Sequence, residues 1–152
     1  MELRKLPKGN ELINPLGLGM GSMQGSSEEE IEQVIKEAIA NGINFFDLCA
    51  GGSIVYKPFG KAIKGQRDKV YIQVHFGAVY NANGDYGWSR NLNQIKKTFT
   101  WELEQLGTDY VDFGFLHCID EDEDFEAIKK NGILDYLVEL KNKGVIHHIG
   151  FS

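Results

Sequence analysis

The sequence predicts an α/β protein built from about five parallel βαβ-type units. Segments rich in β-branched and aromatic residues alternate along the chain with segments whose apolar residues recur at helical spacing. Glycine or asparagine follows most of the helical segments, as is typical of helix C-termini. Strands that alternate with helices in this way form a parallel sheet with helices covering it.

The chain is expected to open with a small β-hairpin over residues 1–14. Residues 3–6 and 11–13 are short apolar segments, and the stretch PKGN between them is rich in turn-forming residues. Residues 16–20, LGLGM, then predict a short strand. The hairpin therefore precedes the repeated units and is not a domain of its own.

The first helix has clear start and stop signals. Ser27 and Glu30 have the spacing of a capping box, which marks a helix N-terminus. Asn41 and Gly42 supply the left-handed stop. A strand over residues 43–48 is expected to follow at once.

The same alternation continues to the last residue. The expected elements are a short helix over 59–64, a strand over 69–76, a helix over 91–107, a strand over 111–117, a helix over 133–144 and a strand over 148–152. Residues 77–90 are expected to form a long loop. Residues 119–124, IDEDED, predict a solvated acidic loop before a helix, because they lack the glycine and the distal glutamate of a calcium loop.

Composition and charge exclude several classes of function. The chain has 152 residues, 42% hydrophobic and 25% charged, which is typical of a folded globular protein. Sixteen basic and 22 acidic residues give a formal net charge of −6 without a basic stripe, so we expect no nucleic-acid partner. No apolar stretch approaches the roughly 20 residues that span a bilayer, and the start lacks a signal-peptide core. We therefore expect a cytoplasmic protein without membrane contact, whose Cys49 and Cys118 are reduced and buried.

Four predicted strands finish at or near a polar residue, namely Asp47, His75, His117 and Ser152. In parallel βα architectures the carboxyl ends of the strands meet at one edge, and functional sites assemble there. An ionised Asp47 at the end of a buried strand costs several kcal/mol unless it is paired or solvated. We therefore expect it in a polar cluster at this edge.

One aspartate and two histidines allow two kinds of chemistry. Asp47, His75 and His117 could act as acid–base groups in proton transfer to a substrate oxygen. They could also bind a divalent metal with open positions for water or substrate, as in a metal-dependent hydrolase or lyase. Their spacing in the sequence does not decide between the two.

Six segments, taken in order along essentially the whole chain, resemble the aldo-keto reductases. They are LGLGMG (16–21), GINFFD (42–47), FGKAI (59–63), LGTDYVD (106–112), LH (116–117) and KGVIHHIGFS (143–152). The resemblance implies a (β/α)8 TIM barrel behind an N-terminal hairpin. It also implies NAD(P)H-dependent reduction of a small-molecule carbonyl substrate to an alcohol. A closed barrel takes about 250 residues, so residues 1–152 are expected to form an incomplete one.

The resemblance also implies roles for individual residues. Asp47 matches the catalytic aspartate of the family, and His117 matches its histidine. His75 stands where the family has a lysine. The family tyrosine normally begins a Tyr-Gly pair shortly after the aspartate, and Tyr56, several residues late, is its candidate here.

The cofactor implied by the resemblance is NADPH or NADH. The residues implied at its nicotinamide end are Gly19, Met20, Gly21, Asp47 and Ser152. The family holds the adenosine phosphate with loops after its last strands, which residues 1–152 do not include. The sequence is also similar to a bacterial subgroup with a C-terminal ferredoxin-like domain, whose cysteines are absent from this chain.

A third interpretation is a non-catalytic half-barrel that assembles with another chain. Unpaired edges at the first and fifth strands would recruit a partner, so we expect possible self-association through the open barrel edges. Leu18, Phe46, Val74 and Phe115 are the residues expected to face the barrel interior.

Overall fold

The computed structural model describes residues 2–49 and 51–152. Five parallel strands form the main sheet in the order β3–β4–β5–β8–β9. They are β3 (Leu18–Gly19), β4 (Phe45–Asp47), β5 (Tyr71–Phe76), β8 (Val111–Leu116) and β9 (Ile146–Phe151). The predicted fold class, an α/β chain of about five βα units in an incomplete barrel, is confirmed.

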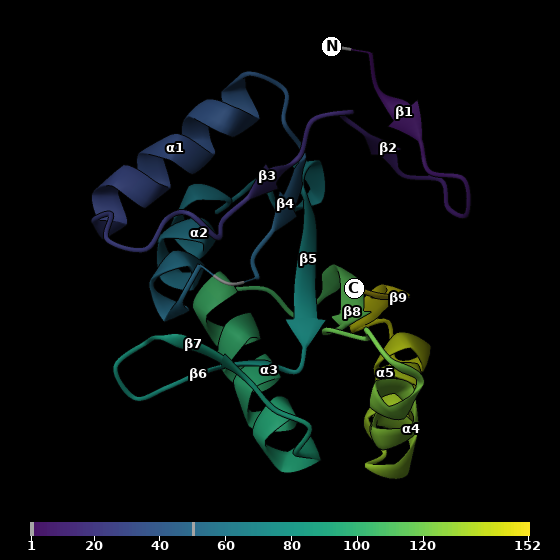
Figure 1. Ribbon diagram of the computed structural model, residues 1–152. Coiled ribbons are helices and arrows are strands. Elements are labelled where there is room, and N and C mark those ends of the chain that lie inside the picture. The colour runs from purple at the N-terminus through teal and green to yellow at the C-terminus, as the bar shows by residue number, and fades with distance from the viewer. Residues whose placement is uncertain (1, 50) are drawn as a thin grey trace.

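A helix follows each of the first four of these strands and packs outside the strand row (Figure 1). The helices are α1 (Glu28–Ala40), α2 (Tyr56–Ala62), α3 (Leu92–Leu106), α4 (Asp122–Lys130) and α5 (Ile133–Asn142), with short 3-10 turns at Ser53–Val55 and Arg67–Lys69. None of the helices in the described part of the chain is long and apolar enough to cross a membrane.

The N-terminal hairpin and the helix boundaries follow the sequence signals. β1 (Arg4–Lys5) pairs antiparallel with β2 (Leu12–Ile13), near the end of the sheet from which β5 starts (Figure 1). The Ser27 hydroxyl accepts from the Glu30 amide while the Glu30 carboxylate accepts from the Ser27 amide, so the predicted capping box is present. Helix α3 ends at Gly107, whose φ of 65° is the left-handed conformation that glycine adopts without steric cost.

A buried ion pair fixes β5 beside β8. The Arg67 guanidinium lies 2.8 Å from Oδ2 of Asp112, and the same oxygen accepts a hydrogen bond from the Ile72 amide at 2.8 Å. Arg67 also donates to the carbonyl oxygens of Val70 and Tyr110. Because Ile72 belongs to β5 and Asp112 to β8, these bonds set the register that aligns the ends of the two strands.

Three of the four side chains that we expected in the barrel interior pack in the core under the helices instead. Phe46 and Val74 are fully buried in the core under the helices, and the Phe46 ring meets Phe59 of α2 at 5.1 Å between centroids. Leu18 pairs in register with Phe46 and packs against the same core. Side chains alternate along a strand, so the barrel interior receives their neighbours instead. Of the four residues named in advance, Phe115 lies beside the inward-facing His75.

Residues 77–90 are not the long loop that we expected. They fold back as a second hairpin, with β6 (Ala78–Tyr80) antiparallel to β7 (Tyr86–Trp88). Asn83 and Gly84 stand at its turn, a dipeptide that favours tight hairpins. The acidic segment 119–124 also differs, because Asp122 already begins α4 and Asp124 completes a capping box with Glu121. In that role the carboxylates interact favourably with the helix N-terminus.

Candidate active site

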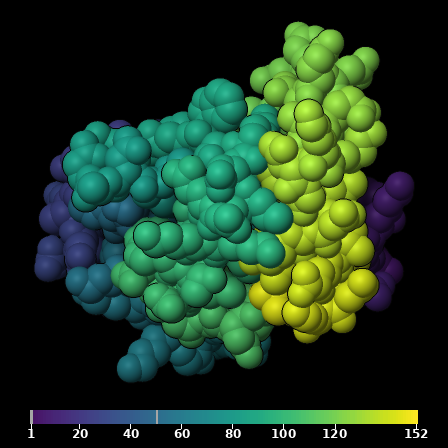
Figure 2. Space-filling model, turned by 90° about the horizontal axis from the view of Figure 1, so that it is seen from below, coloured from purple at the N-terminus to yellow at the C-terminus, as the bar shows by residue number. Residues whose placement is uncertain are grey.

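The strand register brings the predicted polar residues to one edge. Gly19 pairs with Asp47, and His75 pairs with Phe115, the second residue before His117. The Ser152 amide donates to the Leu116 carbonyl oxygen, which places Ser152 next to that same strand end. Figure 2 views the molecule from the end to which β5 points, with teal and green segments in the middle and the yellow C-terminal segment on the right. The expected convergence at the carboxyl edge is therefore present.

Asp47 is both paired and partly solvated. Its Oδ1 lies 3.1 Å from Nε2 of His75 and accepts a hydrogen bond from the Cys49 amide at 3.1 Å. The Asp47 side chain is 34% exposed, whereas that of His75 is 6% exposed. An ionised carboxylate at this position therefore keeps contact with water as well as with its partner, which offsets the cost of removing it from bulk solvent.

The two histidines face each other across β5 and β8. Nδ1 of His75 lies 3.2 Å from Nδ1 of His117, with the ring planes nearly perpendicular. Ser152 Oγ lies 3.4 Å from the same His75 nitrogen, and Cys118 Sγ lies 3.3 Å from Nε2 of His117. Burial lowers the pKa of His117 to about 4, and the neighbouring His75 and Arg90 add to this effect. His117 is therefore neutral at neutral pH.

A tyrosine that the sequence analysis did not select completes the cluster. The Tyr86 hydroxyl, on strand β7, is hydrogen bonded to Nε2 of His117. Tyr86 is half-buried, and burial raises the pKa of its phenol. The Asn-Gly turn flanked by aromatic residues was the signal that could have revealed this hairpin.

Close packing holds the hairpin against the end of β8. Gly77 has a φ of 122°, and a Cβ at this position would lie 3.2 Å from Cβ of His117 and 3.2 Å from Nη1 of Arg90. The Ser89 amide donates to the Gly77 carbonyl oxygen at 2.8 Å, which closes the base of the hairpin. Only glycine satisfies both the backbone angle and the space at this turn.

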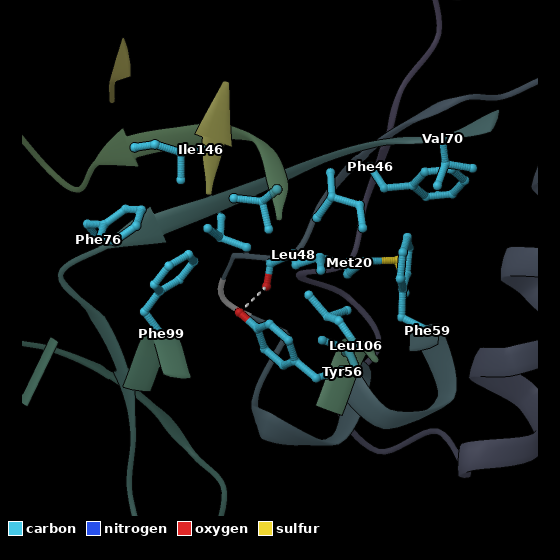
Figure 3. Close-up of a cluster of buried hydrophobic side chains, with 14 of the residues drawn as sticks. Met20, Phe46, Leu48, Tyr56, Phe59, Val70, Phe76, Phe99, Leu106 and Ile146 are labelled. Carbon is cyan, nitrogen blue, oxygen red and sulfur yellow. Dashed lines mark hydrogen bonds between the residues drawn. The ribbon is translucent and has the colours of Figure 1, made fainter. Parts of the chain in front are cut away.

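Tyr56, our candidate for the family tyrosine, lies elsewhere. It is 1% exposed and stands among buried hydrophobic side chains (Figure 3). Its hydroxyl lies 2.7 Å from Oε1 of Glu102 and 2.6 Å from the Tyr80 hydroxyl, with a longer bond to the Leu48 carbonyl oxygen. Burial raises the pKa of Tyr56 well above its ordinary value. The structure therefore does not bring Tyr56 together with Asp47, His75 and His117.

The residues expected at the nicotinamide end differ in accessibility. Gly19, Gly21 and Ser152 are exposed, whereas the Met20 side chain is fully buried in the core (Figure 3). A Cβ built at Gly19 meets nothing within 4 Å, so open space lies directly beside Asp47, its partner in register. A cavity of about 470 Å³ has both residues in its lining. The Gly19 backbone beside Asp47 is therefore accessible, whereas the Met20 side chain is not.

The metal alternative finds partial support in the geometry. Donor atoms of Cys49, His75 and His117 lie within 4.8 Å of one another, which is a spacing that a divalent ion could bridge. Asp47, which we expected in this set, is bonded instead to the far nitrogen of His75. The cysteines are half-buried rather than buried, and both stand next to the cluster.

Comparisons with known proteins agree with this architecture. The sequence model described as "Aldo/keto reductase family" matches residues 15–152. L-galactose dehydrogenase of Arabidopsis thaliana is 29% identical to the chain over 160 residues, which cover 100% of the chain and 48% of that protein. The chain thus spans about half the length of this curated relative.

This chain also covers half the length of two solved aldo-keto reductase structures. The holo form of aldo-keto reductase AKR11C1 from Bacillus halodurans superimposes with a TM-score of 0.76 at 29% identity, covering 100% of this chain and 50% of that one. An aldo-keto reductase from Klebsiella pneumoniae, solved in complex with NADPH, gives a TM-score of 0.67 at 22% identity, covering 99% and 50%. The second likeness shows the fold alone.

Proposed function

This chain belongs to the aldo/keto reductase family, and we propose that its site takes part in the NAD(P)H-dependent reduction of a small carbonyl compound to an alcohol. The observation that carries the proposal is the contiguous polar cluster of Asp47, His75 and His117 at the carboxyl ends of β4, β5 and β8. A cluster with one carboxylate and two imidazoles can hold and deliver the proton that such a reduction consumes.

A nicotinamide cofactor bound here would supply the hydride. The open space beside Gly19 and the exposed backbone at Gly21 and Ser152 would receive its nicotinamide end. The Bacillus halodurans relative was solved in a holo form, which supports a nicotinamide cofactor, NADPH or NADH, at this site. We assign residues of this chain only to the nicotinamide end of the cofactor.

Each polar residue has a distinct task in this proposal. Asp47 holds a proton on Nε2 of His75, because an ionised carboxylate 3.1 Å away disfavours a lone pair at that nitrogen. His117 is neutral, and its Nδ1 faces His75 while its Nε2 is hydrogen bonded to the Tyr86 hydroxyl. His75 therefore stands where the family has a lysine, with one ring nitrogen toward Asp47 and the other toward His117, while His117 orients the group that meets the carbonyl oxygen.

The test is a spectrophotometric assay of NADPH and NADH oxidation at 340 nm with a panel of aldehydes, ketones and sugars. The assay should be run on this chain and on any longer natural protein that contains it. We expect carbonyl-dependent oxidation, lost in Asp47→Asn. Oxidation that is absent with every carbonyl in both forms would contradict the proposal.

A second candidate is metal-dependent hydrolysis or elimination, which the grouping of Cys49, His75 and His117 favours. Elemental analysis of the purified protein separates the two candidates. A stoichiometric divalent metal, with an activity that a chelator abolishes and the metal restores, would support this second candidate. Carbonyl reduction that survives chelation would contradict it.

A further inference from the structure

We propose that Tyr86, carried by the β6–β7 hairpin, is the group that donates the proton to the carbonyl oxygen, and that His117, His75 and Asp47 resupply it through one continuous hydrogen-bonded chain. This inference rests on the proposed function and deepens it. It assigns the proton donor to a residue outside the segment in which the resemblance placed a tyrosine.

Four groups, three on strands and His117 directly after β8, form an unbroken series of contacts. The Asp47 carboxylate lies 3.1 Å from Nε2 of His75. The other nitrogen of that ring, Nδ1, lies 3.2 Å from Nδ1 of His117. The remaining nitrogen of His117, Nε2, is hydrogen bonded to the Tyr86 hydroxyl. Each imidazole therefore uses one nitrogen toward each neighbour, which is the arrangement that a proton relay requires.

The four hydrogen-bonded groups have two proton arrangements in which every contact joins one donor to one acceptor. In the first, His75 is neutral, its Nε2–H donates to Asp47, Nδ1–H of His117 donates to His75, and the Tyr86 hydroxyl donates to His117. In the second, one more proton is present. His75 is then a cation that donates to both Asp47 and His117, and Nε2–H of His117 donates to the Tyr86 oxygen. Only this second arrangement leaves the Tyr86 hydrogen free to point at a substrate.

One reduction converts the second arrangement into the first. The Tyr86 O–H bond breaks and its proton joins the carbonyl oxygen, while the hydride from the nicotinamide cofactor joins the carbonyl carbon. The proton on Nε2 of His117 then moves to the Tyr86 oxygen, and the proton on Nδ1 of His75 moves to Nδ1 of His117. The four groups have together lost one proton, which is the proton that the alcohol gained. A proton from solvent restores the cation.

The surroundings agree with these tasks. Tyr86 is half-buried, whereas His75 and His117 are each 7% exposed. The Asp47 carboxylate lies 3.1 Å from Nε2 of His75, so an additional proton is placed on His75, beside the negative charge. Burial raises the pKa of Tyr86, so its phenol is protonated and able to donate. The side-chain nitrogen of Gln73 also lies 3.1 Å from Nε2 of His75.

Nitrogen-detected NMR of the four histidines, on the chelator-treated chain without cofactor, tests the relay independently of activity. When both nitrogens of His75 carry hydrogen, His117 should carry its own hydrogen on Nε2, and when Nδ1 of His75 carries none, on Nδ1. Assignment by His147→Gln and His148→Gln variants removes the other signals. A His117 that keeps one tautomer in both states of His75 would overturn the relay.

Steady-state kinetics of Tyr86→Phe test the donor itself. We expect kcat to fall about 10²-fold or more, with KM for the carbonyl and affinity for NADPH changed less than about threefold, because only proton transfer is removed. Tyr71→Phe, at the opposite end of β5, is the matched control and should leave kcat unchanged. A wild-type chain inactive toward every carbonyl contradicts the proposed function. Normal kcat in Tyr86→Phe, with an active wild type, overturns this inference alone.

Discussion

The Nδ1 atoms of His75 and His117 face each other at 3.2 Å, on strands β5 and β8 or directly after them. At this distance one nitrogen must carry a proton and the other must accept it, since two facing lone pairs repel. The tautomer of one imidazole therefore determines which nitrogen of the other can carry hydrogen. The Arg67–Asp112 ion pair that fixes these two strands is thus a remote determinant of the chemistry at their ends.

We expect Asp47→Asn to lower the turnover of carbonyl reduction by about 10²-fold, the usual scale for a positioned acid–base group. The amide cannot carry the negative charge that lies 3.1 Å from Nε2 of His75, so a proton on that ring loses its charged partner. Initial rates at saturating carbonyl measure this effect. Asp109→Asn, an exposed aspartate away from the cluster, is the control. Equal rates in Asp47→Asn and the control would contradict the role of Asp47.

Glu102 should make the fold less stable as the pH rises. Burial raises the pKa of this carboxyl group to about 8, against an ordinary value of 4.5. The native state therefore retains a proton that the unfolded state has lost, and stability falls by about 1.4 kcal/mol per pH unit between these two values. Urea unfolding at pH 4.5 and pH 8 measures this loss. Glu102→Gln keeps an acceptor for the Tyr56 hydroxyl and should abolish most of the pH dependence. An unchanged slope in Glu102→Gln would show that other groups cause it.

Asp112→Ala should lower the free energy of unfolding by about 3–5 kcal/mol, because it leaves Arg67 buried without its charge partner. It also leaves the Ile72 amide without its acceptor. The double variant Arg67→Ala/Asp112→Ala should lose less than the sum of the two single variants, since it leaves no unpaired charge. Chemical denaturation of all three measures the coupling. Strict additivity would show that the pair does not stabilise the β5–β8 register.

The chain alone should self-associate through its open edges. Within residues 2–49 and 51–152, β3 and β9 each pair with one strand only, and Phe151 at the end of β9 is 71% exposed. Unpaired strands recruit a second chain, and a charge on the edge opposes this. Sedimentation velocity at micromolar concentration should show dimers or larger species, reduced in Phe151→Lys but not in Phe125→Lys on α4. A compact wild-type monomer would contradict this expectation.

The sequence predicted the architecture because its signals are local. The Ser27 capping box, the Gly107 stop and the run of strand-forming residues in β5 each act within a few residues, and the structure contains all three. The convergence of Asp47, His75 and His117 was also predictable, since parallel strands end at one edge.

The proton donor could not be predicted in the same way. Tyr56 stands in the segment in which the family resemblance indicated a tyrosine. Its hydroxyl, however, donates a hydrogen bond to the buried Glu102 carboxyl group. Tyr86 reaches His117 only because the 77–90 segment folds back as a hairpin against the end of β8. That contact depends on the three-dimensional path of the chain, which spacing along the sequence does not encode. The same holds for the assignment of strand faces, where Phe46 and Val74 turn toward the helices.

The most direct test of the central claim is the transfer of deuterium to a carbonyl compound from NADPH that carries deuterium at both hydrogen positions of nicotinamide C4. Mass spectrometry of the product identifies the carbon that receives the label. Reduction at this site predicts an alcohol with one deuterium on the former carbonyl carbon, formed by the wild type and about 10²-fold more slowly by Asp47→Asn. An alcohol without the label, or label transfer that is equally fast in Asp47→Asn, would contradict the account.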